Sequence, residues 1–232
     1  KEISEAKEKG NLGLMQRLYF KACRFLFTIG AILSGFLIPW SKEIIYLMLG
    51  PSYGEGAPAL VVMLVYMTFG SLAQINGSML LATNKTKTHV KLGIILMVIF
   101  IPISYFILAS KNSHIPGLEL GSFGLALKML LFTIIYVNVL SRYICQDYGW
   151  KLDWIYQVII YGAVLGFSFL SFELVKILNS LIIINMFFKV SLTLLLYCGF
   201  VITMIWNIPQ LVGTSRKEIQ QYIFKIFKLS WV

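Results

Sequence analysis

The sequence predicts an all-α polytopic membrane protein with about six transmembrane helices. Composition is the first reason, because 58% of the 232 residues are apolar and 13% are charged, whereas about a quarter of the residues in a soluble domain are charged. The apolar residues are also gathered into segments that approach the roughly 20 residues a helix needs to cross a bilayer core of about 30 Å. Lys and Arg concentrate in alternate gaps between these segments, which is the pattern of cytoplasmic loops.

The first three predicted spans are residues 25–40, 57–82 and 92–109. The first is short unless its helix extends back through Lys21 and Arg24, whose charged ends can snorkel to the interface. In the third span, Pro102 removes a backbone donor and clashes with the preceding turn, so we expect a kink there.

The last three predicted spans are residues 120–141, 154–172 and 181–206. Gly162 and Gly166 are four residues apart in the fifth span, a spacing that predicts close helix packing. Beyond the sixth span, apolar and basic residues alternate with helical periodicity. This pattern predicts an amphipathic helix lying on the cytoplasmic leaflet, with a partner-binding helix as the alternative.

The chain therefore divides into a cytoplasmic connector (1–24), a six-helix transmembrane region (25–206) and a cytoplasmic amphipathic basic tail (207–232). Fifteen of the 20 basic residues lie in the connector, the tail and the gaps 85–91 and 142–151. This distribution places both termini in the cytoplasm and makes the number of spans even. The connector contains acidic residues and no cleavage pattern, so it is not a signal peptide. Since it begins at Lys1 and not at Met, we expect it to continue from an earlier part of a longer protein.

No cofactor or metal site is predicted. Cys23, Cys145 and Cys198 lack the paired spacings of metal sites and disulfide frameworks. His89 and His114 fall in loops on opposite sides of the membrane, so they cannot share a metal ion. The basic residues flank apolar runs, which indicates contact with membrane lipids and argues against nucleic-acid binding.

Two lysines interrupt the charge alternation because they lie inside apolar segments: Lys128 in the fourth span and Lys189 in the sixth. A Lys at the centre of a membrane helix costs about 2.5 to 3.5 kcal/mol on insertion scales and normally faces a cavity or a partner. Both residues also lie about two turns from a predicted helix end, so snorkelling is the alternative interpretation.

A stripe of cations leads into the first span. Arg17, Lys21 and Arg24 share one helical face with Thr28. This face could attract an anionic substrate from the cytoplasm, or it could only anchor the helix by the positive-inside rule.

The second span carries a small and polar face that includes Gln74. Gly70, Gly77 and Ser78 share this face, and Asn76 lies beside it. These residues could line a polar path, or they could mediate close helix packing with an interhelical hydrogen bond.

Four short motifs occur in an order that resembles a known family. They are Ile3-Ser4-Glu5-Ala6 with Gly10-Asn11, Leu49-Gly50-Pro51-Ser52-Tyr53, the run Leu81 to Lys87, and Pro116-Gly117 with Gly121 to Ala126. Together they are similar to the C-terminal half of oligosaccharide-lipid flippases of the multidrug/oligosaccharidyl-lipid/polysaccharide exporter superfamily. The resemblance covers roughly residues 3–141, and beyond that only the pattern of spans agrees.

The resemblance implies the second lobe of a V-shaped flippase in the bacterial inner membrane, which is not an enzyme. Its cargo would be an undecaprenyl-pyrophosphate-linked oligosaccharide, and a polysaccharide polymerase or other assembly proteins would be further partners. Such a cargo requires cations and hydrogen-bonding groups facing a cavity. The candidate substrate-binding residues are therefore Lys21, Arg24, Gln74, Lys128 and Lys189.

Other functions stay open at this point. A cation-coupled multidrug antiporter of the same superfamily would be expected to carry an intramembrane carboxylate, and no Asp lies in any predicted span while Glu119 and Glu173 sit at predicted outer ends. A membrane enzyme of polysaccharide assembly would need positioned carboxylates or His for acid–base chemistry. A noncatalytic scaffold would tolerate the loss of Lys128 and Lys189.

Overall fold

The computed structural model describes residues 2–181, 185–214, 216 and 218, and all regular structure within these residues is helical. Six helices are long and apolar enough to cross a membrane. The predicted fold class is therefore confirmed: the chain is an all-α, multi-pass membrane protein. The amphipathic part of the tail, including Lys225 and Lys228, lies outside the described residues.

Long membrane-spanning helices are joined by turns, loops and short helices. In chain order they are α1 (Glu2–Glu8), α2 (Leu12–Leu37), η1 (Ile38–Trp40), α3 (Ser41–Leu49), η2 (Pro51–Gly56), α4 (Ala57–Ala82), α5 (Thr86–Leu108), α6 (Gly121–Asp147), α7 (Ile155–Leu181), α8 (Met186–Asn207) and η3 (Pro209–Val212).

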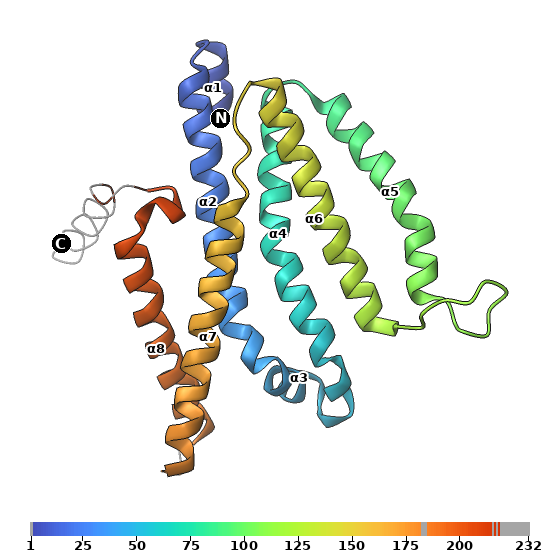
Figure 1. Cartoon of the computed structure of the whole chain (residues 1–232), viewed down its shortest axis with the longest axis vertical. Coiled ribbons are helices and arrows are strands. Elements are labelled where there is room, and N and C mark those ends of the chain that lie inside the picture. The colour runs from blue at the N-terminus through green and yellow to red at the C-terminus, as the bar shows by residue number, and fades with distance from the viewer. Residues whose placement is uncertain (1, 182–184, 215, 217, 219–232) are drawn as a thin grey trace.

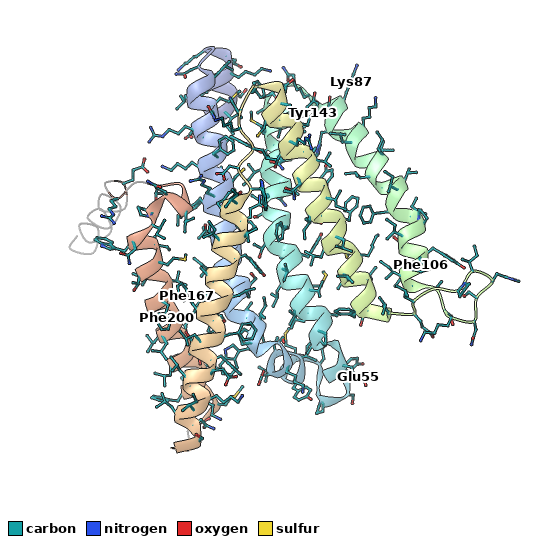
Figure 2. All side chains as sticks on the ribbon, viewed as in Figure 1. Glu55, Lys87, Phe106, Tyr143, Phe167 and Phe200 are labelled. Carbon is teal, nitrogen blue, oxygen red and sulfur yellow. The ribbon has the colours of Figure 1, made fainter. Side chains whose placement is uncertain are left out.

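The long helices form two groups (Figure 1). Helices α4, α5 and α6 lie side by side on one flank of α2, and α7 and α8 lie on its other flank. We call the end that contains α1, the α4–α5 turn and the α6–α7 connection the basic end, and the opposite end the α3 end. Lys87 and Tyr143 mark the basic end and Glu55 marks the α3 end (Figure 2). The predicted alternation of basic gaps thus corresponds to one end of the helix bundle.

The first span is longer than its apolar core. Asn11 caps α2, since its Oδ1 accepts a hydrogen bond of 2.9 Å from Leu14 N–H, and the helix then runs without a break to Leu37. It passes through Lys21 and Arg24, which is the extension that a full-length first span required. The predicted boundary between connector and membrane region therefore falls inside a continuous helix.

The predicted border between the last two spans is wrong. Leu181 belongs to α7, and α8 begins only at Met186. Helix α7 continues well past Phe172 through Glu173 and Lys176, which are exposed and pair with each other at 3.1 Å on successive turns. Hydropathy alone predicts that the span ends where charged residues begin. An ion pair on successive turns is instead compatible with a continuing helix.

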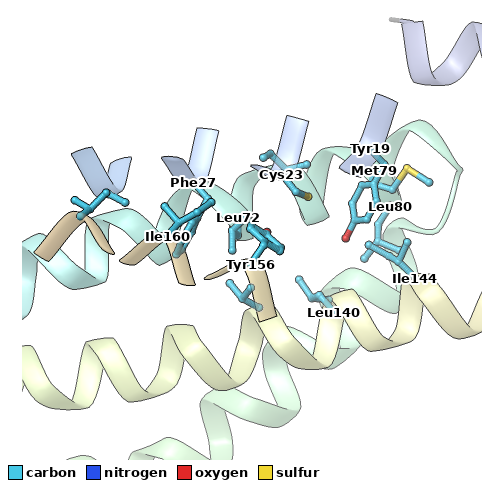
Figure 3. Packing of buried hydrophobic residues seen from close by; sticks show 14 of the residues in the cluster. Tyr19, Cys23, Phe27, Leu72, Met79, Leu80, Leu140, Ile144, Tyr156 and Ile160 are labelled. Carbon is cyan, nitrogen blue, oxygen red and sulfur yellow. The ribbon is translucent and has the colours of Figure 1, made fainter. Parts of the chain in front are cut away.

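A core of apolar side chains joins α2 to both flanks (Figure 3). Residues spaced by four along α2, including Tyr19, Cys23 and Phe27, are buried. They pack on Leu72 of α4 and Ile160 of α7, among others. Many large apolar residues on the opposite helix faces are exposed. Such faces contact lipid in a membrane protein, where close packing and not the removal of water holds the helices together.

Gly35 of α2 lies at a close contact with two other helices. A Cβ at this position of α2 would collide with Val164 Cγ1 of α7 and would lie 3.1 Å from Tyr197 Oη of α8. A Cβ at Gly162 or Gly166 would meet nothing within 4 Å. The predicted packing motif in α7 is therefore wrong, because close helix contacts occur at other glycines, including Gly35 of α2 and Gly124 of α6.

Polar side chains inside the bundle bond across helices. Tyr19 Oη donates to Asn76 Oδ1 at 2.7 Å, and Asn76 Nδ2 donates to Val137 O at 3.1 Å and to Ser141 Oγ at 2.9 Å. These bonds tie α2, α4 and α6 together. Deeper in the bundle, the Ser34 and Thr68 hydroxyls lie 2.9 Å apart between α2 and α4.

Ion pairing closes the basic end around Lys85. Its ammonium pairs with the carboxylate of Asp147 at the end of α6 and lies 5.3 Å from the ring centroid of Tyr148. Partial burial disfavours the charge, but the hydrogen bond and attraction of Asp147 outweigh it and raise the pKa of Lys85. The α4–α5 turn is thereby fixed to α6 with Lys85 in its charged form.

Candidate functional site

A cavity of about 510 Å³ lies between α4, α5 and α6. It exists because α5 packs mainly on α6 and makes only a small contact with α4, so the three helices do not close against one another. Its walls are Tyr66, Gly93, Met97, Phe100, Ile101, Ser104, Lys128, Met129, Phe132, Thr133 and Tyr136. Its volume falls in the range of small-molecule sites in proteins, about 300 to 1,000 Å³.

Lys128 provides the positive charge of this cavity. It stands about two turns from the start of α6 at Gly121 and is partly buried. Among the described residues, its ammonium group has no hydrogen-bond or ion-pair partner. Of the two interpretations of Lys128, the structure agrees with the cavity-facing one. An unpaired cation of this kind has the capacity to bind an anion.

Aromatic rings and hydroxyl groups complete the walls. The rings of Phe100 and Phe132 meet edge to face with centroids 5.0 Å apart, and Phe132 stacks on Tyr136 at 5.8 Å. Tyr136 Oη lies 3.1 Å from His89 Nδ1, which connects the wall to the first turn of α5. The cavity therefore offers one cation, several hydroxyl groups and apolar rings, a combination suited to an anionic amphiphile.

Lys189 occupies a different environment. It is the fourth residue of α8, which starts at Met186, and it is only partly buried. It lies in the α7–α8 pair, while Lys128 belongs to the α4–α5–α6 group across α2 (Figure 1). The two lysines, which both lie inside apolar segments of the sequence, are thus on opposite sides of α2. The position of Lys189 near a helix end agrees with snorkelling.

The cationic stripe on α2 borders a second, smaller cavity of about 360 Å³ at the basic end. Arg24 pairs there with the carboxylate of Asp153, just before α7, and donates to Gln210 O at 2.5 Å. Lys21 and Arg17 both pair with Glu218, at 3.3 Å and 3.2 Å. These cations therefore already have carboxylate partners in the chain itself.

The tail crosses this stripe through Gly213. Its backbone has a φ of +74°, and a Cβ there would lie 3.1 Å from Lys21 Cα. Glycine meets both requirements, a left-handed backbone and a close approach to α2. The stripe consequently serves as a docking surface for the segment after α8, whether or not it also attracts an anion.

Gln74 points away from the bundle, whereas its neighbour Asn76 is fully buried and makes the three bonds described above. The sequence analysis placed Asn76 beside the polar face but chose Gln74 as the candidate site residue. Tyr19, which the structure places in α2, is the partner that identifies Asn76 as an interhelical contact, because a buried Asn needs hydrogen-bond partners from other helices. The structure places Gln74 outside the cavity that contains Lys128.

No group of three or more His, Cys, Asp or Glu side chains in the described part of the chain could hold a metal ion. The sequence was compared with family models, curated proteins and solved structures, and none of them matches. The resemblance to the flippase superfamily therefore stays a prediction based on the motifs.

Proposed function

We propose that the chain forms one lobe of a transporter that moves a lipid-linked oligosaccharide, bearing a pyrophosphate, across a bacterial inner membrane by alternating access. The observation that carries the proposal is the unpaired Lys128 ammonium in a cavity of about 510 Å³ between membrane helices. A pyrophosphate would pair with this cation, hydroxyl groups would bind sugar, and the lipid tail would stay among the lipid-facing helices.

The distribution of carboxylates supports an anionic cargo over a cation-coupled one. In the long helices α2, α4, α5 and α8 no Asp or Glu occurs. Asp147 is the last residue of α6, and Glu173 in α7 is exposed and paired. An antiporter would be expected to bury a carboxylate in such a helix. The charge distribution predicts that the basic end lies in the cytoplasm, the side on which such a cargo would be loaded.

Membrane potential could supply the drive. Outward movement of about two negative charges through roughly 100 mV, inside negative, is favoured by about 5 kcal/mol. Flipping in proteoliposomes should therefore slow when an ionophore collapses the potential. A flipping rate that ignores the potential would contradict this part of the proposal.

Binding tests the proposal most directly. The whole chain in nanodiscs should bind an undecaprenyl-pyrophosphate-linked oligosaccharide, and Lys128→Ala should weaken binding by about tenfold or more because a charge-assisted hydrogen bond is lost. Lys128→Arg should keep most of the affinity. Lys111→Ala is the matched control, since Lys111 is exposed in the loop between α5 and α6. Equal affinities for wild type and Lys128→Ala would refute the assigned site.

A further inference from the structure

An apolar groove of about 520 Å³ lies at the α3 end, between the α2–α3 corner and the first turns of α8. It is separate from the Lys128 cavity. Its walls are Phe36, Leu37, Trp40, Glu43, Ile44, Tyr46, Leu47, Met186 and Val190. Beside it, Leu47 and Met48 of α3 are 87% and 75% exposed. A short helix with such an apolar outer face lies at the boundary between headgroups and acyl chains.

Two polar atoms in these walls are buried without partners. They are the indole Nε1 of Trp40, a donor, and Oε2 of Glu43, an acceptor. No described residue forms an ion pair with the Glu43 carboxylate. Buried polar groups are ordinarily hydrogen-bonded, and an unpaired one is costly. The groove thus combines an apolar channel with one unsatisfied acceptor and one unsatisfied donor.

The cation next to Glu43 in the sequence, Lys42, forms no ion pair with it. Lys42 is exposed and faces a different cavity, which it lines together with Ser52 and Glu55. Trp40 is fixed in place by the edge-to-face contact of its ring with Phe172 of α7, at 5.2 Å between centroids. The orientation of its indole is therefore set by packing, and its buried N–H has no hydrogen-bond partner among the described residues.

We infer that this groove binds a phospholipid whose headgroup carries a primary ammonium. One acyl chain would lie along the apolar walls, the ammonium would donate a hydrogen bond to Glu43, and the Trp40 N–H would donate to a phosphate or ester oxygen of the same lipid. Charge complementarity selects this occupant. A headgroup with net negative charge would be repelled by Glu43, and a quaternary ammonium has no N–H to donate.

Native mass spectrometry of the whole chain tests the inference. The protein is extracted from vesicles that contain equal amounts of phosphatidylethanolamine and phosphatidylcholine with identical acyl chains. Wild type should retain phosphatidylethanolamine with a preference of about tenfold, the value of one charge-assisted hydrogen bond. Glu43→Gln should bring this preference close to one. Trp40→Phe, which keeps a ring against Phe172, should lower retention of both lipids.

Glu55→Gln is the matched control, because Glu55 is an exposed carboxylate at the same end outside the groove. It should leave the preference unchanged. Helical circular dichroism and gel filtration show that each variant is folded before its lipid content is compared. This readout involves no oligosaccharide, so it succeeds or fails independently of the proposed transport function.

Three results would overturn the inference. The first is equal retention of both lipids by wild type, and the second is an undiminished preference in folded Glu43→Gln. The third is a dimeric mass without bound phospholipid, which would assign the groove to a second copy of the chain.

Discussion

The α4–α5–α6 group differs from the α2–α7–α8 group in that it contains a partly buried cation, Lys128, without a partner among the described residues. In the second group, Ser168 Oγ donates to Gly35 O at 2.6 Å and Tyr197 Oη donates to Ile32 O at 2.8 Å. In the first group, Lys128 has no partner among the described residues and faces a cavity. Polar groups that bond within the protein hold helices together, whereas an unsatisfied cation is free for a ligand. We therefore call the α2–α7–α8 group the scaffold, because its helices are bonded to one another, and the α4–α5–α6 group the binding unit, because it contains the cavity proposed for the transported cargo.

Phe167 and Phe200 form a direct packing contact between two helices of the scaffold (Figure 2). Their rings stack between α7 and α8 with centroids 5.6 Å apart. By contrast, the rings of Phe100 and Phe132, which meet between α5 and α6, line the Lys128 cavity. The same residue type fills an interface in one group and lines a cavity in the other.

The largest expected effect comes from Gly35→Ala in the scaffold. The added methyl group collides with Val164 and approaches Tyr197, so the free energy of unfolding should fall by about 2 kcal/mol. Gly166→Ala in α7 is the control, because its Cβ meets nothing and Ala favours a helix by up to about 1 kcal/mol. Unfolding in mixed micelles, followed by circular dichroism, measures both. Similar values for the two variants would show that α2 and α7 are not closely packed at Gly35.

The next effect concerns the bonds that Asn76 of α4 makes to α2 and α6. Asn76→Ala removes three hydrogen bonds and leaves Tyr19 without its acceptor, so stability should fall by about 1 to 2 kcal/mol in the same assay. Gln74→Ala, two residues away on an exposed face, should change it by less than about 0.5 kcal/mol. If Gln74→Ala were the more damaging variant, the assigned orientation of α4 would be wrong.

A smaller effect is expected at the basic end, where Arg24 and Asp153 join α2 to the start of α7. Each single Ala variant and the double variant form a thermodynamic cycle, whose coupling energy should be about 0.5 to 1 kcal/mol for a partly exposed pair. High salt should reduce the coupling further. The pair Lys176 and Glu173, both more than half exposed, serves as the comparison and should couple less.

The smallest expected change in stability is at Lys128 in the binding unit, and it has the opposite sign to the others. Lys128→Met removes an unpaired charge from the membrane region, so stability should stay the same or rise by less than about 1 kcal/mol. Binding of the lipid-linked oligosaccharide should be lost in this folded variant. A clear loss of stability would mean that Lys128 supports the fold and would remove the contrast between the two groups.

Hydropathy was sufficient to predict the six spans, since lipid exposure requires apolar residues over a fixed length whatever the helix arrangement. Hydropathy did not predict the helix ends that are determined by local side-chain contacts. Helix α7 continues through the exposed pair of Glu173 and Lys176, and Asn11 places the start of α2 well before the apolar core. Helix α3 was not predicted as an element, because a span-length window cannot separate nine residues from the helix before it.

The candidate site could be predicted only in part, because charge can be read from a sequence but helix orientation cannot. Lys128 and Lys189 carry the same charge at similar predicted depth, yet only Lys128 lines one of the described cavities. Gln74 and Asn76 are two positions apart, about 200° around a helix, so one faces outward when the other is buried. Which of them is inside depends on contacts with α2 and α6 that single-span periodicity does not contain.

The attachments of α2 also determine which parts of the molecule can move. Helix α4 is bonded to α2 at two separate levels, through Tyr19 with Asn76 and through Ser34 with Thr68. Helix α7 is likewise attached at two levels, through Asp153 with Arg24 and through Ser168 with Gly35. Two attachments at different levels oppose both tilting and sliding, so α2, α4 and α7 act as a rigid frame.

Helix α5 is outside this frame, because its main contact is with α6 alone. It also forms one wall of the Lys128 cavity. The volume around that cation can therefore change through the displacement of a single peripheral helix, without breaking any of the bonds that hold the frame together.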